Sequence, residues 1–198
     1  MGMPAPRHSA PTERWTAEQV RALQDESRAW PRYELIDGEL LVSPAPRLAH
    51  QRAVRLLLDA LSPYVRAQPI GELFSSPADL ELVPEGVLQP DAFVVPLVAG
   101  KRPQTWPDVR SLLLAVEVLS PGTARYDRVT KRRFYQRIGV PEYWVVDLDA
   151  RVVERWRAGD ERPEPLDERL VWHPEGASES FTLDLPSFFA EVHDEREA

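Results

Sequence analysis

The chain has 198 residues, of which 43% are hydrophobic, and it carries a net charge of −8. This length is enough for one well-filled core, so we expect a single domain over residues 15–192, with a disordered tail at 1–14 and a short tail at 193–198. Cysteine is absent, which excludes disulfides, thiolate metal sites and cysteine nucleophiles. We find neither a stretch of roughly 20 apolar residues nor a signal-peptide pattern, so we expect a cytoplasmic protein without membrane partners.

The negative charge is concentrated in the C-terminal part of the chain. Residues 147–198 hold 15 acidic and 6 basic side chains, a balance of −9, whereas residues 1–146 hold 17 acidic and 18 basic side chains. Within the latter, residues 125–137 carry six basic side chains and one acidic side chain. This basic segment is either a phosphate-facing surface or an ordinary solvated helix face. In the first case, the acidic region is expected to lie away from the phosphates.

The chain is predicted to begin with a helix and a hairpin. Thr16 and Gln19 have the spacing of a capping box, which predicts a helix over residues 17–28. An Asp-Gly pair at 37–38 is a strong hairpin-turn signal, so residues 33–43 are expected to form two antiparallel strands.

A longer helix and a second hairpin are expected next. Apolar residues recur at helical spacing over 48–67, with His50 on the apolar side. Residues 72–83 and 87–95 are then expected to be two continuous strands that pair as a hairpin. The remaining elements are expected as a loop at 101–108, a buried strand at 112–119, a helix at 125–138, a strand pair at 143–147 and 152–156, a loop at 160–169, short strands at 170–172 and 180–183, and a helix at 186–192.

One carboxylate interrupts the most apolar strand. Residues 112–119 are all apolar apart from Glu117, as expected for a strand that is covered on both faces of a sheet. An unpaired carboxylate there would cost several kcal/mol or take up a proton, so Glu117 must meet a cation side chain, a metal ion or hydrogen-bond donors. Asp91 follows Pro90 in another apolar run, and Lys131 lies on the helix after Glu117. Two strand carboxylates followed by a lysine indicate a divalent-metal phosphodiesterase site.

Several segments together resemble a known nuclease family. They are Pro90-Asp91 followed by Glu117, the sequence YELIDGEL at 33–40, EVLSP at 117–121, Asp127 with Lys131, and GVPEYWVVD at 139–147. In this order they resemble the Uma-two family of bacterial restriction-endonuclease-like proteins, within the PD-(D/E)XK nuclease superfamily. The resemblance implies an α/β fold with a restriction-endonuclease-like core, in which a mixed sheet is flanked by helices.

The same resemblance implies a metal-dependent endodeoxyribonuclease that uses magnesium or manganese and acts on DNA. Asp91 and Glu117 would then be metal ligands and catalytic residues, together with Lys131 and Glu34. Mg²⁺ uses only one or two protein carboxylates, so this ligand number is sufficient. The DNA-binding candidates are Arg125, Arg128, Arg132 and Arg133. His50 and Asp127 are accessory candidates.

The sequence departs from the family pattern at one position. The motif lysine two residues beyond Glu117 is replaced by Leu119, and Lys131, held by Asp127 one turn earlier, is its natural substitute. The pair could equally be a simple helix support. Likewise Glu117 could be paired with an arginine, and His50 could be an ordinary core histidine.

Three wider alternatives or expectations accompany this prediction. A catalytically inactive nuclease fold could act as a DNA-binding or protein-interaction module, an alternative favoured by Leu119 and by the overall acidity. The same carboxylates could also serve a hydrolase of small phosphodiesters. Because cutting both strands of a duplex is simplest with two symmetric sites, we expect a homodimer.

Overall fold

The computed structural model describes residues 14–26 and 30–195, and three sheets and four α-helices lie in these ranges. The elements are α1 (Ala17–Glu26), β1 (Arg32–Ile36), β2 (Glu39–Ser43), α2 (Leu48–Ala67), β3 (Gly71–Ser75), β4 (Leu80–Val83), β5 (Gly86–Leu88), β6 (Ala92–Pro96), η1 (Trp106–Asp108), β7 (Leu114–Val118), η2 (Tyr126–Lys131), α3 (Arg132–Arg137), β8 (Glu142–Asp147), β9 (Val152–Arg157), β10 (Glu164–Leu166), β11 (Arg169–Trp172), β12 (Phe181–Asp184) and α4 (Leu185–Val192).

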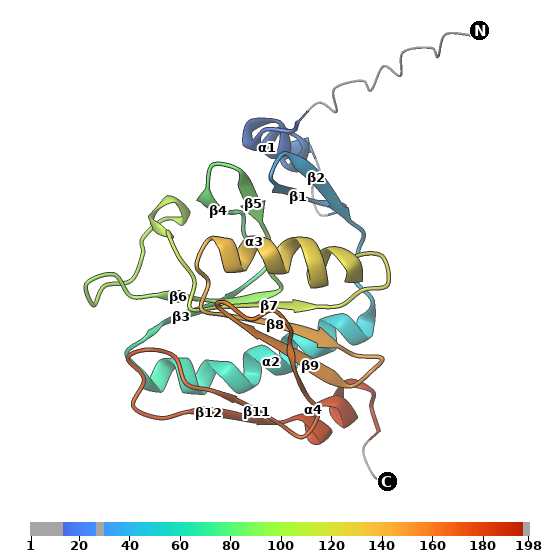
Figure 1. Ribbon diagram of the computed structural model, residues 1–198, viewed down its shortest axis with the longest axis vertical. Coiled ribbons are helices and arrows are strands. Elements are labelled where there is room, and N and C mark those ends of the chain that lie inside the picture. Colours follow the sequence, from blue (N-terminus) through green and yellow to red (C-terminus); the bar gives the residue numbers. More distant parts are fainter. Residues whose placement is uncertain (1–13, 27–29, 196–198) are drawn as a thin grey trace, which may run out of the picture.

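A six-stranded mixed sheet forms the centre of the molecule (Figure 1), with the strand order β10-β9-β8-β7-β6-β3. Strands β7 and β8 are parallel and the other neighbours are antiparallel. The parallel pair requires a crossover, which η2 and α3 provide on one face, while α2 and α4 cover the other face (Figure 1). The expected α/β fold with a mixed sheet between helices is therefore confirmed.

Strand β7 shows why both faces of this sheet are apolar. Val116 and Val118 belong to the core that α2 and α4 cover, whereas Ala115 belongs to the core under α3. Because side chains alternate along a strand, Glu117 lies on the α3 side with Ala115. The apolar sequence of this strand thus buries a single carboxylate between the sheet and the crossover helix.

A second sheet, with the order β2-β1-β5-β4, lies beside the crossover helix (Figure 1). Its first hairpin turns at Asp37 and Gly38, whose φ angles of 53° and 80° are those that a tight two-residue hairpin turn requires. Helix α1 packs on this sheet through Val20, which contacts the cluster of Leu35 and Val87. The reciprocal hydrogen bonds between Thr16 and Gln19 confirm the predicted capping box.

The second predicted hairpin was wrong in its strand limits. The run expected at 72–83 divides into β3 in the large sheet and β4 in the small sheet, and the run at 87–95 divides into β5 and β6 in the same way. Pro77 and Pro90 lie at the two divisions, where a residue without an N–H cannot continue a strand ladder. The chain therefore crosses twice between the sheets, and Asp91 lies directly after the second crossing.

Three further expectations need correction. The helix expected over 125–138 begins as the π-helical turn η2 before it becomes α3. The loop expected at 160–169 contains β10, which pairs with β9. The loop expected at 101–108 ends in the 3₁₀ turn η1.

The remaining elements agree with prediction to within a few residues, and α2 spans the predicted 48–67. Residues 27–28 of the first predicted helix, residues 1–13 of the predicted N-terminal tail and residues 196–198 of the predicted C-terminal tail lie outside the described residues. Among the helices of the described ranges, none is long and apolar enough to cross a membrane.

Candidate active site

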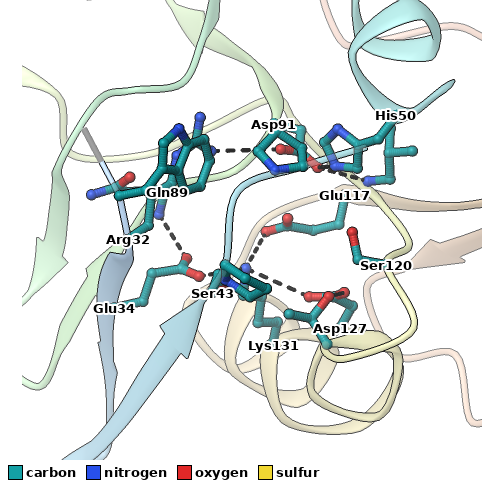
Figure 2. Close-up of a pocket in the computed structure, with 15 residues that line it drawn as sticks. Arg32, Glu34, Ser43, His50, Gln89, Asp91, Glu117, Ser120, Asp127 and Lys131 are labelled. Atoms are coloured by element: carbon teal, nitrogen blue, oxygen red, sulfur yellow. Dashed lines mark hydrogen bonds and ion pairs between the residues drawn. The ribbon is translucent and has the colours of Figure 1, made fainter. Parts of the chain in front are cut away.

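A small pocket of about 40 Å³, partly open to solvent, lies where β1, the first turn of α2, the end of β7 and η2 meet (Figure 2). Its buried lining, which we call the floor, consists of Glu34, His50, Gln89, Asp91, Glu117, Val118, Asp127 and Lys131. Its partly exposed lining, which we call the rim, consists of Trp30, Arg32, Ser43, Pro44, Pro46, Ser120 and Thr123. The structure therefore brings all six predicted acidic, lysine and histidine candidates into one pocket.

Lys131 lies at the centre of the floor (Figure 2). Its Nζ atom is 2.7 Å from Glu34 Oε2, 2.9 Å from Glu117 Oε1 and 3.5 Å from Asp127 Oδ1. The widened π-helical turn places residues four apart on nearly the same side of η2, so Asp127 and Lys131 both face inward. Lys131 thus reaches the strand carboxylate Glu117 from the helix that follows the strand.

Asp91 is fixed by groups from three other segments. Its Oδ2 atom accepts a hydrogen bond of 2.9 Å from the backbone N–H of Val118 and is 3.1 Å from His50 Nε2. Its Oδ1 atom is 3.7 Å from a guanidinium nitrogen of Arg32. Since Val118 directly follows Glu117, the first of these bonds holds the Asp91 carboxylate at the end of the strand that carries Glu117.

Glu34 is buried on β1, the strand that pairs with β5 in the smaller sheet. Its Oε1 atom accepts the backbone N–H of Gln89 at 2.8 Å, while Oε2 contacts Lys131. The hydroxyl of Tyr135 donates to Glu117 Oε1 over 3.4 Å. Sequence reasoning missed Tyr135 and Arg32; the first lies four residues beyond Lys131, a helical neighbour that the spacing could have indicated, whereas Arg32 had no local signal.

Negative charge exceeds positive charge in this cluster. Four carboxylates, of Glu34, Asp91, Glu117 and Asp127, lie in the floor with Lys131, and Arg32 is the other permanent cation among the described residues that line the pocket. Leaving His50 aside, the described lining carries two more negative than positive groups. Such an excess in a dry environment favours either proton uptake or a bound cation.

The pKa values of the carboxylates separate accordingly. Burial raises the pKa of Glu117 well above its usual range, because desolvation and the neighbouring carboxylates outweigh the attraction of Lys131. Burial also raises the pKa of Asp127. Desolvation acts in the same direction on Asp91, but the hydrogen bond and charge of His50, the Val118 N–H and Lys131 together hold the pKa of Asp91 below its usual value. Desolvation lowers the pKa of Lys131, but the surrounding carboxylates hold it well above the ordinary lysine value.

The donor set of the floor suits a hard divalent cation. In residues 14–26 and 30–195, three or more His, Asp or Glu side chains nowhere converge as a set of metal ligands. Mg²⁺, however, keeps several waters and uses one or two protein carboxylates. Asp91 and Glu117, held at the same strand end within a cluster of excess negative charge, fit that requirement.

The four predicted DNA-binding arginines are not gathered around the pocket, and none of them belongs to its described lining. Arg128 pairs with Asp147 and with Glu154 at 2.7 Å, and Arg132 lies 4.6 Å over the ring of Trp156. Two carboxylates of the acidic C-terminal region therefore contact the basic segment. The exposed members of this set are Arg125 and Arg133.

Comparisons with known proteins agree with the fold. Residues 17–189 match the sequence model of the Uma2 family, which is described as "Putative restriction endonuclease". None of the curated proteins matched. Among solved structures, the chain is similar to a protein from Anabaena variabilis ATCC 29413 described as "a putative nuclease belonging to DUF820", with a TM-score of 0.67 and 21% identity over 87% of this chain and 98% of that chain. That likeness shows a shared fold, and because the family match spans most of the sequence, this chain belongs to the Uma2 family of nuclease-like proteins.

Proposed function

We propose that this protein is a metal-dependent endodeoxyribonuclease that hydrolyses phosphodiester bonds in DNA. The observation that carries the proposal is the position of Lys131, whose ammonium lies between Glu34 and Glu117 in the floor of a pocket that also contains Asp91. Two strand carboxylates and a lysine converge there although the usual strand lysine is replaced by Leu119. Membership of a family described as restriction endonucleases supports the same conclusion.

The cationic and anionic residues of the floor would have different roles in catalysis. Lys131 is held cationic by its carboxylate partners, so it can offer positive charge to the non-bridging oxygens on which negative charge develops during cleavage. His50 and the Val118 N–H fix the orientation of Asp91, while Glu34 and Asp127 hold the Lys131 ammonium in place. Mg²⁺ or Mn²⁺ at Asp91 and Glu117 would supply Lewis-acid neutralisation of the phosphate.

Cleavage of supercoiled plasmid in Mn²⁺ tests this proposal. We expect the wild type to nick or linearise the plasmid and Asp91→Asn, which keeps the shape of the side chain, to be inactive. Asp37→Asn is the matched control, because Asp37 carries the same change in an exposed turn where it pairs with Arg137. Equal activity of Asp91→Asn and Asp37→Asn would reject the assigned site, and an inactive wild type would reject the proposed chemistry.

A catalytically inactive nuclease fold is the second candidate, favoured by one feature of the floor. Each of the three carboxylates around Lys131 lies within 3.5 Å of its ammonium, so the lysine already has a complete set of protein partners. In that case the wild type would bind DNA or a protein without cleaving the plasmid. The homodimer stays a prediction, which light scattering at micromolar concentration would test.

A further inference from the structure

The rim of the pocket differs from its floor in chemistry. The floor is built of buried charged groups, whereas the rim offers an indole, a guanidinium, two proline rings and hydroxyl groups. Among the described residues of the rim, none is acidic. The entrance is therefore suited to flat, partly apolar groups that are attached to phosphate.

The reactive groups lie deep below this entrance. The side chains of Lys131, Glu34 and Glu117 are 4–5% exposed, and that of Asp91 is 10% exposed. A phosphate has to pass the rim to reach Lys131. In a duplex, each backbone is held on the outside of a stack of base pairs, whereas an unpaired strand can direct one phosphate into a recess. Enzymes that do chemistry on a base in a recessed pocket likewise act on single strands or on extruded nucleotides.

Trp30 and Arg32 form the stacking surface of the rim. The guanidinium carbon of Arg32 lies 4.4 Å from the centroid of the Trp30 ring, and the same guanidinium is 3.7 Å from Asp91. Unpaired bases stack on aromatic rings and on guanidinium planes, whereas the bases of an intact duplex have both faces covered by their neighbours. The pair thus connects a surface that suits an unpaired base with the carboxylate that would hold the metal.

We propose that the rim residues Trp30, Arg32, Pro44 and Pro46 bind an unpaired nucleotide whose phosphate enters the floor. The substrate is then single-stranded DNA, or an unpaired stretch within a duplex, and not a perfectly paired duplex. This inference rests on the proposed nuclease function for its catalytic part, but the binding preference can be measured without catalysis.

The first test compares three forms of one labelled oligonucleotide with the wild-type protein. The forms are the single strand, the perfect duplex and a duplex with a central mismatched loop, and their binding is measured by fluorescence anisotropy in EDTA. We expect the single strand and the looped duplex to bind about tenfold more tightly than the perfect duplex, since stacking of one base contributes roughly a factor of ten. General charge attraction predicts the opposite order, because a duplex has the higher density of phosphates.

The second test asks whether Trp30 causes the preference. Trp30→Ala should remove it and Trp30→Tyr should keep it, because tyrosine preserves a ring on which a base can stack. Trp106→Ala is the matched control: Trp106 is also partly exposed, but it lies in η1 against Phe74, outside the pocket. Thermal melting of each variant verifies that the protein is folded, and the wild-type comparison stands even if a variant does not fold.

Cleavage of the same three forms in Mn²⁺ separates this inference from the proposed function. Preferential binding and cleavage of the unpaired forms would support both. Preferential binding without any cleavage would support the rim assignment and reject the nuclease chemistry. Equal or tighter binding of the perfect duplex, or an unchanged preference in a folded Trp30→Ala protein, would overturn the inference even if the duplex is cleaved.

Discussion

The two sides of the segment 125–137 use similar residues in very different environments. On the inner side, Asp127 and Lys131 are 2% and 4% exposed and belong to a cluster of ion pairs. On the outer side, Arg125 and Arg133 are exposed to solvent. The inner side of this stretch thus contributes charges that have fixed partners in the buried floor of the pocket. Its outer side contributes charges that water and salt can screen.

This difference shows that burial, more than charge itself, determines the importance of each residue. Charges interact more strongly in a low-dielectric interior than at the surface, but their desolvation is also costly. Lys131 offsets that cost through three carboxylates, and its removal would leave them buried without their cation. Removal of an outer arginine leaves only solvated groups behind.

Replacement of Lys131 should produce the largest effect. Lys131→Met should abolish DNA cleavage and destabilise the protein at neutral pH by about 3–5 kcal/mol, because it leaves buried carboxylates without a partner. The raised pKa of Lys131 means that its contribution to stability is present below the unfolded-state pKa and is lost only as pH rises through the higher folded-state pKa. In the variant, the loss should shrink in mild acid, where the abandoned carboxylates take up protons.

The free energy of unfolding of Lys131→Met and Arg133→Met is measured by urea unfolding at neutral and mildly acidic pH. Arg133→Met removes one positive charge from the outer side of the same segment, so its unfolding curve should stay close to that of the wild type at both pH values. Similar destabilisation by the two substitutions would contradict the contrast between the two sides.

Removal of the exposed arginines should have an intermediate effect, confined to DNA binding. If Arg125 and Arg133 contact phosphates, the double change to alanine should reduce the slope of log affinity against log salt by up to about 1.8, from roughly 0.9 per contact with a duplex. Arg66 and Arg169 are exposed on other elements, and their double replacement is the charge-matched control. If both double variants keep the wild-type slope, the outer arginines are a solvated surface.

Neutralisation of Glu117 should produce the smallest effect on stability, and one of opposite sign. Its pKa is raised in the folded state, so its ionised form costs stability, and the wild type loses stability relative to a neutral variant as pH rises above the ordinary glutamate range. Glu117→Gln should therefore be more stable than the wild type by about 1 kcal/mol at neutral pH, with the gain disappearing in acid. A variant less stable than the wild type in EDTA at neutral pH would show that the ion pair with Lys131 outweighs desolvation.

The sequence predicted features that depend on local patterns. The limits of α2 follow from apolar spacing, and the turn at 37–38 follows from its Asp-Gly pair. Prediction from the sequence was wrong where strands that are consecutive in the chain belong to different sheets. Nothing in the local sequence shows that β3 and β4 separate in this way. The site divides in the same way, because Glu117 was evident as a carboxylate in an apolar strand but its partners were not.

The partners of the site residues depend on contacts between distant segments. His50 meets Asp91 because the first turn of α2 lies at the end of β7, and Glu34 meets the backbone N–H of Gln89 because β5 pairs with β1. The pairing of Arg128 with Glu154 likewise joins segments that lie far apart in the sequence. Charge type and segment order were thus accessible from the sequence, whereas burial and pairing required the three-dimensional structure.

Calorimetric titration of Mn²⁺ into metal-free protein tests the central claim most directly, namely that the excess negative charge around Asp91 and Glu117 is a divalent-cation site. The wild type and the Asp37→Asn control should bind Mn²⁺ with the same affinity, and a double variant, Asp91→Asn with Glu117→Gln, should show no binding in the same range. Absence of binding to the wild type, or equal binding to the double variant, would contradict the account.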